Sequence, residues 1–117
     1  MVEELQIETR TEQGVAILEL KGLLNVSTYG KLEKALKALF NEGRYRVIVD
    51  MGKVEYVSSA GAGALMNALS QCNSHQGRLV LVNLSPSVLE VLDVLSLNRV
   101  FPTMPSLESA LAAFRTT

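Results

Sequence analysis

The sequence has little of several residue types on which most enzymes and metalloproteins depend. Its 117 residues include one cysteine, one histidine and no tryptophan. One cysteine cannot form an internal disulfide, which fits a reducing compartment, and no further ligands stand at the spacing of a metal site. No apolar run approaches the roughly 18 residues that span a bilayer. Residues 1–4 (Met, Val, Glu, Glu) also lack the basic and apolar regions of a secretory signal. We therefore expect a cytoplasmic protein, not inserted in a membrane, that needs no metal or other cofactor.

No charge of one sign dominates the chain. Lys and Arg number 11 against 12 Asp and Glu, and the aromatic residues are three Tyr and three Phe. A nucleic-acid-binding face would need clustered basic residues with stacking aromatics, so the composition argues against one. The hydrophobic fraction of 48% indicates one globular domain over residues 1–117, with a core that requires no disulfide.

The hydrophobic pattern predicts an α/β domain. Strand-like runs at residues 5–7 and 15–20 flank a turn at 12–14, and Gly22 is expected to end the second run. Short strands are predicted at residues 47–49 and 79–82, with a weak one near 100–101. Two helices are predicted from about Ser27 to Gly43 and from about Ala60 to Ser74. A third helix is expected to begin after the Ser85 cap, with an apolar face formed by Val88, Leu89, Leu92 and Leu95, and a fourth after the Ser106 cap. This order predicts a mixed β-sheet of four or five strands with an initial β-hairpin and about four helices packed mainly on one face.

The most informative segment joins the buried strand at 47–50 to the second helix. We expect a short turn after the strand, with Asp50 and Glu55 solvated in it, and then two serines, Ser58 and Ser59, that open the helix. A serine there lies at the positive end of the helix dipole, beside N–H groups without intrahelical partners, which suits a phosphate. The alternative is that Ser58 or Ser59 serves only as the N-cap.

Signals of catalysis are weak. His75 is expected to be solvated at the end of the second helix, and Cys72 to be a buried small hydrophobe on its apolar stripe. Gly61 and Gly63 resemble part of a dinucleotide fingerprint, but Met66 stands where a third small residue is needed. A small nucleotide-binding α/β domain therefore stays a minor alternative. The simpler role of these glycines is close packing of the helix start, or approach of a partner to its backbone.

Three sequence blocks and the order of elements resemble the STAS family, in particular its single-domain bacterial anti-sigma factor antagonists. The blocks are residues 20–25, residues 47–51 continued by 54–63, and residues 79–101. The second block is the most specific, since it is similar to the family pattern Asp-Ser-(Ser/Ala)-Gly-Leu-Gly at the start of the second helix. The resemblance covers nearly the whole chain.

The resemblance implies a regulatory protein and not an enzyme. In this family the serine at the helix start is phosphorylated by a partner that is both anti-sigma factor and serine kinase. The unphosphorylated antagonist binds that ATP-binding partner and the sigma factor is released; phosphorylation ends the contact and a serine phosphatase restores it. The acceptor implied here is Ser59, with Ser58 as the alternative. The implied partner-binding surface, together with the exposed face of the second helix, comprises Leu24, Asn25, Val26, Ser27, Thr28, Ser58, Ala60, Gly61, Ala62 and Gly63.

Three positions depart from the family pattern. Asn25 and Ser58 stand where the family has aspartates, so polarity is kept and charge is lost. Ala62 replaces a leucine, which we expect to remove an apolar contact with the partner. The neutral residues favour a second hypothesis, in which the chain is a constitutive STAS interaction module, either a scaffold or a subunit of a transporter complex, that works without phosphorylation.

Overall fold

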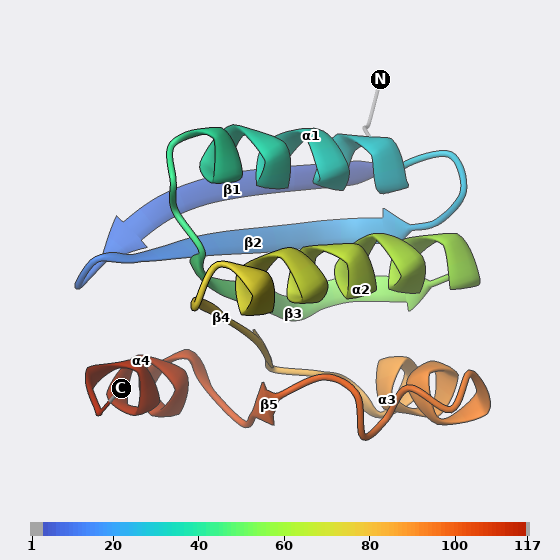
Figure 1. The fold of residues 1–117 in the computed structure, drawn as a ribbon. Coiled ribbons are helices and arrows are strands. Elements are labelled where there is room, and N and C mark those ends of the chain that lie inside the picture. Colours follow the sequence, from blue (N-terminus) through green and yellow to red (C-terminus); the bar gives the residue numbers. More distant parts are fainter. Residues whose placement is uncertain (1–3, 117) are drawn as a thin grey trace.

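A computed structural model describes residues 4–116; most of the segment used to judge a secretory signal, residues 1–3, lies outside this range. One five-stranded sheet has the strand order β1-β2-β3-β4-β5, with β1 antiparallel to β2 and the remaining neighbours parallel (Figure 1). Along the chain the elements are β1 (Leu5–Glu12), β2 (Val15–Leu24), α1 (Tyr29–Asn41), β3 (Arg46–Val57), α2 (Ser59–Ser74), β4 (Arg78–Val82), α3 (Pro86–Val94), β5 (Thr103–Met104) and α4 (Leu107–Arg115). The predicted mixed sheet is confirmed.

The initial hairpin has a two-residue turn. Glu12 pairs with Val15, and the two residues between them, Gln13 and Gly14, have φ angles of 54° and 78°. Positive φ at both central positions is the requirement of a type I′ turn, whose twist matches the flanking strands. The predicted hairpin is therefore confirmed, and β1 becomes one edge of the sheet.

The two faces of the sheet are covered unequally. On β2, Ala16, Leu18 and Leu20 belong to the larger hydrophobic cluster, which includes residues of α1, α2 and α3. The smaller cluster on the opposite face joins β-strand residues such as Ile17 to α4. Three helices thus contribute to the core of one face, as predicted, and α4 covers the other.

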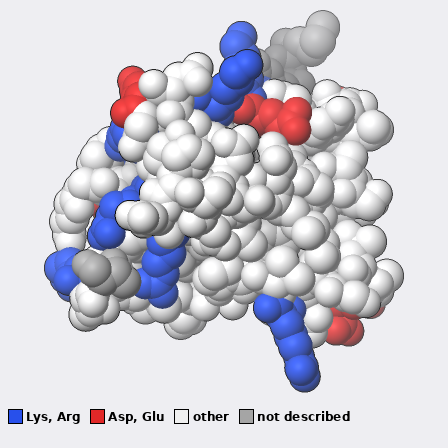
Figure 2. Space-filling view, viewed as in Figure 1, with Lys and Arg blue, Asp and Glu red and all other residues white. Residues whose placement is uncertain are grey.

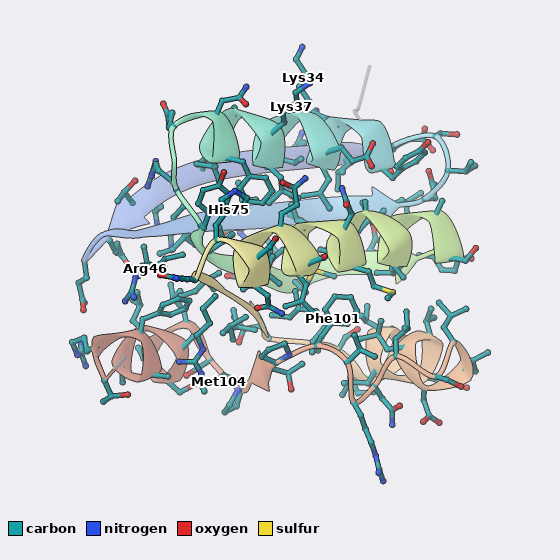
Figure 3. The ribbon with its side chains drawn as sticks, viewed as in Figure 1. Lys34, Lys37, Arg46, His75, Phe101 and Met104 are labelled. Carbon is teal, nitrogen blue, oxygen red and sulfur yellow. The ribbon has the colours of Figure 1, made fainter. Side chains whose placement is uncertain are left out.

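The chain changes faces next to β5. Phe101 is part of the larger cluster, whereas Met104 packs against the smaller one (Figure 3). The weak strand lies at Thr103–Met104 and not at residues 100–101 as predicted. Since β5 pairs with β4 over two residues only, it serves mainly to carry the chain across the sheet edge to α4.

The prediction that Gly22 ends the second strand is wrong. Gly22 has a φ of +115°, and a side chain there would collide with the carbonyl group of Glu4. The next residue, Leu23, donates its N–H to that same carbonyl at 2.7 Å. Glycine therefore makes an irregularity inside β2, which continues to Leu24.

The predicted turn after residue 50 is also wrong, because β3 runs on to Val57. Beyond Asp50, which pairs with Val82, the strand has β2 alone as a neighbour, and its last pair is Val57 with Leu24. Asp50 lies in the strand and accepts hydrogen bonds from the Gly52 N–H at 3.0 Å and the Asn83 amide at 3.1 Å. The long β2–β3 pairing delivers both strands to the same end of the molecule, beside the start of α2.

The helix boundaries follow local capping signals. Ser85 and Ser106 are the N-caps of α3 and α4, and their hydroxyl oxygens accept N–H bonds within the first turn. The first helix begins at Tyr29, two residues later than predicted. None of the helices within residues 4–116 combines the length and apolar character needed to cross a membrane.

Candidate functional site

The candidate site lies at the end of the molecule where β2 and β3 terminate. Figure 1 shows the β2–α1 loop, the start of α2 and α3 at this same end. The Ser58 N–H donates to the Leu24 carbonyl at 2.9 Å, so the segments 24–28 and 58–63 lie side by side. In open α/β sheets, binding sites form beyond the carboxyl ends of the parallel strands.

The two serines have different structural roles. Ser58 is the N-cap of α2, with extended backbone, and its hydroxyl oxygen accepts the Gly61 N–H at 3.2 Å. Ser59 is the first helical residue, is exposed, and its hydroxyl makes no hydrogen bond within residues 4–116. The N-cap hypothesis therefore applies to Ser58, and the Ser59 hydroxyl remains accessible at the positive end of the helix.

Gly61 allows α2 to pack tightly on the end of β2. A Cβ atom at this position would lie 2.7 Å from both the side chain and the carbonyl oxygen of Leu24. Because Leu24 covers it, the Gly61 backbone is not open to a pyrophosphate, which argues against the dinucleotide hypothesis. Gly63, in contrast, is exposed and has no atom near the position of an added Cβ.

The loop between β2 and α1 is held by its own polar groups. The Asn25 side-chain oxygen accepts the Ser27 N–H at 2.9 Å. The buried Thr28 hydroxyl donates to the Leu23 carbonyl at 2.7 Å and accepts the Asn25 N–H at 2.9 Å. Asn25 and Ser58 both act through an acceptor oxygen, a role that an aspartate would perform equally well. These two departures from the family pattern therefore preserve the local hydrogen bonds and remove negative charge.

The residues proposed to contact a partner differ in exposure. Val26, at 72% exposed, lies with Ser27 and Gly63 on the surface, while Asn25, Ser58 and Ala60 are half-buried. The buried members of the set are Leu24, Thr28, Gly61 and Ala62. These four lie beneath the surface and support it. Ala62 packs in the core cluster, and the expectation that its small side chain removes an apolar contact with the partner stays a prediction.

Sequence reasoning missed an apolar groove beside Ser59. It has a volume of about 520 Å³ and lies between the end of β3 and α3; its lining includes Tyr56, Ser59, Glu90, Val91 and Val94. We call it the α3 groove. Tyr56 is 50% exposed and Val94 is 77% exposed. Figure 2 shows few charged side chains over the right-hand end of the molecule, where α2 begins, and more Lys and Arg at the opposite end.

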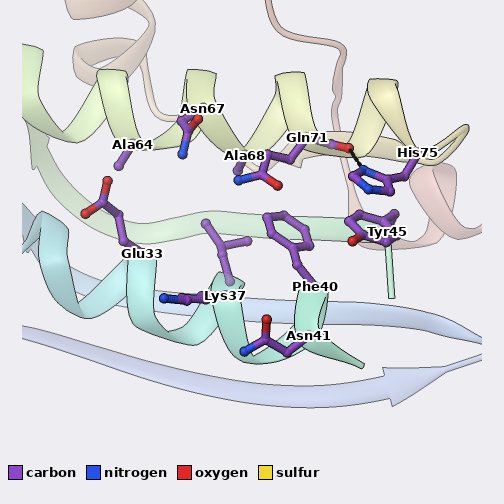
Figure 4. A pocket seen from close by; sticks show the side chains of 11 residues that line it. Glu33, Lys37, Phe40, Asn41, Tyr45, Ala64, Asn67, Ala68, Gln71 and His75 are labelled. Atoms are coloured by element: carbon purple, nitrogen blue, oxygen red, sulfur yellow. Dashed lines mark hydrogen bonds between the residues drawn. The ribbon is translucent and has the colours of Figure 1, made fainter. Parts of the chain in front are cut away.

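A second groove, of about 490 Å³, lies between α1 and α2 (Figure 4). The rings of Phe40, Tyr45 and His75 form a stack, with centroids 5.1 Å and 3.9 Å apart. His75 is exposed, as predicted, and its Nδ1 lies 2.9 Å from the Gln71 carbonyl. His75 follows the last turn of α2, about 24 Å along the helix axis from Ser59 at about 1.5 Å per residue.

Groups for metal or thiol chemistry are not assembled in the described part of the chain. Within residues 4–116, no three side chains from His, Cys, Asp and Glu lie together as potential metal ligands. Cys72 is fully buried, which confirms the prediction, and burial raises the pKa of its thiol to about 11. The thiol is therefore protonated at neutral pH.

Comparison with known proteins identifies similar chains. Residues 6–110 match the STAS domain family. The chain is 38% identical over 103 residues to BtrV of Bordetella bronchiseptica, named an anti-sigma factor antagonist, an alignment that covers 88% of this chain and 89% of the relative. It is 29% identical over 93 residues to the anti-sigma-B factor antagonist of Staphylococcus epidermidis, covering 80% and 86% respectively.

Solved structures share the fold at lower sequence identity. A Thermotoga maritima chain described as an anti-sigma factor antagonist has a TM-score of 0.87 and 23% identity, covering 93% of this chain and 94% of that one. A sulfate transporter family protein from Wolinella succinogenes has a TM-score of 0.77 and 20% identity, covering 92% and 89%. The predicted fold class is confirmed, and the same fold occurs in proteins of different function.

Proposed function

This chain belongs to the STAS domain family, and from that premise we propose that it is an anti-sigma factor antagonist switched by phosphorylation of Ser59. The unphosphorylated chain binds an anti-sigma factor that is also a serine kinase, and the sigma factor is released. Phosphorylation ends the contact, and a serine phosphatase restores it. The names of the Bordetella and Staphylococcus relatives support the antagonist role.

The observation that carries this proposal is the division of roles between the two serines. Ser58 uses its hydroxyl to cap α2, whereas Ser59 presents an exposed hydroxyl without a hydrogen-bond partner among residues 4–116. A kinase can reach Ser59 without breaking the cap. Ser58, in contrast, is half-buried and its hydroxyl is held by the Gly61 N–H, so a kinase would have to displace it from the cap, and Ser59 is the better acceptor of the two.

The position of Ser59 explains how a phosphate would end binding while the domain stays folded. A phosphate adds roughly −1.5 to −2 charges at neutral pH. At the first residue of α2 this charge lies near free N–H groups and the positive end of the helix dipole, so the domain tolerates it. In a packed interface the same group has a large desolvation cost, and a partner would be released.

A constitutive STAS interaction module is the second candidate. It is favoured by the neutral residues Asn25 and Ser58, which leave the acceptor serine without the nearby carboxylates of the family pattern. The sulfate transporter neighbour shows that this fold also occurs outside antagonists. This candidate predicts a chain that is never phosphorylated in its host.

The intact mass of the chain purified from its own host distinguishes the two candidates. We expect a phosphate-sized increment, and fragmentation of the peptide covering residues 53–78 should place it on Ser59 and not on Ser58. An unmodified mass under several growth conditions would favour the constitutive module.

Three variants test the switch in a binding assay with the anti-sigma factor of the same host. Ser59→Ala should bind like the wild type and stay bound when ATP is added, whereas Ser59→Asp should bind at least tenfold more weakly. Ser58→Ala is the matched control: it removes a cap, which costs about 1 kcal/mol of stability, and leaves phosphorylation in place. Tight binding by Ser59→Asp would contradict the switch.

A further inference from the structure

We propose that the α3 groove is the docking site for an apolar side chain of the anti-sigma factor, flanked in that partner by Lys or Arg. The inference rests on the proposed function. It extends the contact surface from residues 24–28 and 58–63 to α3, which sequence reasoning did not include.

The groove exists because β3 is longer than its neighbour β4. The β3–β4 pairing ends with Asp50 and Val82, so the edge of β3 beyond that pair has no strand beside it. The helix α3 covers this edge by burying Val88 and Leu92 in the core. A helix laid along a strand edge does not fill the space at the strand's end, and the groove opens there beside Tyr56.

The helix α3 has exposed apolar side chains on its outer side, beside its charged ones, as well as buried ones on its inner side. Leu89 and Val94 are 44% and 77% exposed, and the charged residues of the helix are Glu90 and Asp93 alone. A surface helix ordinarily has a polar outer face. Of these two side chains, Val94 lines the α3 groove, as does the half-exposed Tyr56. Exposed apolar side chains that line a concave surface are typical of a site that another molecule covers.

The charge around the groove defines the chemistry of that molecule. Glu90 is the one charged residue that lines the groove, Asp93 is exposed on the same helix, and α3 contains no Lys or Arg; the exposed Arg99, in the segment after α3, does not line the groove. A partner with basic side chains beside its apolar anchor would match this acidic rim, and complementary charges favour association and fix its orientation. An acidic partner surface would be repelled.

The groove also gives the phosphate a direct way to end binding. Ser59 and Glu90 line the same groove, so a phosphate on Ser59 would add negative charge where an apolar side chain is to be buried. Burial of the partner's apolar side chain would then remove water from a phosphate that lies near a carboxylate, which is unfavourable. Release therefore requires no rearrangement of the chain.

The test is a titration of the wild type and variants with the anti-sigma factor of the chain's own host, followed by calorimetry or fluorescence anisotropy. Val94→Glu and Tyr56→Ala should each weaken binding at least tenfold, as expected when a central apolar contact is lost. Val100→Glu is the matched control, because Val100 is 42% exposed but does not line the groove. Its affinity should stay within twofold of the wild type. Equal melting temperatures would show that the variants are folded.

Charge reversal at Glu90 tests the part of the proposal that assigns Lys or Arg to the partner. Glu90→Lys should weaken binding and reduce its dependence on salt, whereas Glu33→Lys on α1, outside this groove, should do neither.

The docking site and the proposed function would fail with different experimental results. Wild-type affinity in both Val94→Glu and Glu90→Lys would overturn the docking site and leave the proposed function intact. No binding of the wild type or of Ser59→Ala to the anti-sigma factor would overturn the proposed function and the occupant assigned here. A dimer of the free chain that Val94→Glu converts to a monomer would mean that a second copy, not an anti-sigma factor, occupies the groove.

Discussion

Gly61 and Gly63 are two residues apart on α2 and have opposite surroundings. Gly61 is buried against Leu24, whereas an added Cβ at Gly63 would meet no other atom. We expect Gly61→Ala to lower the free energy of unfolding by about 1–3 kcal/mol through overpacking. Gly63→Ala should raise it by about 0.5–1 kcal/mol because alanine favours the helix. Urea unfolding measures both changes.

The same pair of variants separates the two roles that the sequence analysis assigned to the glycines. If a partner approaches the α2 backbone closely, Gly63→Ala should weaken binding while it stabilises the fold. Unchanged stability in Gly61→Ala would mean that Leu24 moves aside at little cost, and the close-packing argument would then be lost.

Cys72 makes the stability of the fold depend on pH, and this effect is independent of the binding site. Burial raises the pKa of its thiol from the ordinary value of 9.0 to about 11, so the folded state holds this proton more tightly than the unfolded state. The resulting stability is fully present below pH 9 and is lost as the pH rises through 11. The loss should be on the order of 2–3 kcal/mol, at about 1.4 kcal/mol for each pKa unit.

Comparison of the wild type with Cys72→Ala isolates this effect from the titration of lysines and tyrosines. The difference in unfolding free energy between the two proteins should be nearly constant from pH 7 to 9. Above pH 9 the unfolding free energy of the wild type should fall relative to that of Cys72→Ala. A thiol that reacts with an alkylating agent at pH 8 as fast as a free cysteine would contradict the burial of Cys72.

At the scale of elements, β3 shows what the local sequence cannot decide. Gly52 and Lys53 interrupt the apolar pattern, and this predicts a turn after Asp50. The segment is nevertheless a strand, because Lys21 and Gly22 of β2 pair with Lys53 and Val54. Such pairing is a long-range contact and leaves no periodic signal in a short window. The caps of α3 and α4, which depend on neighbours within three residues, were predictable.

The helix α3 illustrates the same limit for the candidate site. Val88 and Leu92 were correctly assigned to the core, but Leu89, assigned with them, is exposed. A helix that is apolar on two sides has no single face that its periodicity could select. The groove beside Ser59 was missed for that reason, although the absence of Lys and Arg from α3 was visible in the sequence.

Alanine substitution at two leucines of α3 tests which side faces the core. Leu92→Ala should lower the free energy of unfolding by about 2–4 kcal/mol, since it removes a buried side chain. Leu89→Ala, the same chemical change on the exposed side, should stay within about 0.5 kcal/mol of the wild type. Equal losses in chemical denaturation would mean that α3 is rotated about its axis relative to the orientation described.

For the whole molecule, the positions of the basic residues matter as much as the net charge. Arg46 and Arg78 stack over the Phe114 ring and donate to the carbonyls of Phe114 and Ala113 at the end of α4. Figure 3 shows Arg46 at the end of the molecule away from the start of α2. Residues 24–28 and 54–66 contain no Lys or Arg. A phosphate on Ser59 would therefore find no basic side chain within these segments, and its charge would stay available to oppose a partner.

This arrangement predicts that phosphorylation changes binding and leaves the fold unchanged. Negative charge at a helix N-terminus stabilises by about 0.3–1 kcal/mol, which for a domain of this size raises the melting temperature by a few degrees at most. Calorimetry of the phosphorylated and unmodified chains should show equal or slightly higher melting temperatures, while affinity for the anti-sigma factor falls at least tenfold. Kinase-treated Ser59→Ala should match its untreated form in both measurements.

A melting temperature that drops by more than about 5 °C on phosphorylation would show that the phosphate acts by loosening the domain. In that case loss of affinity would follow from altered structure, and not from charge placed in an otherwise intact groove.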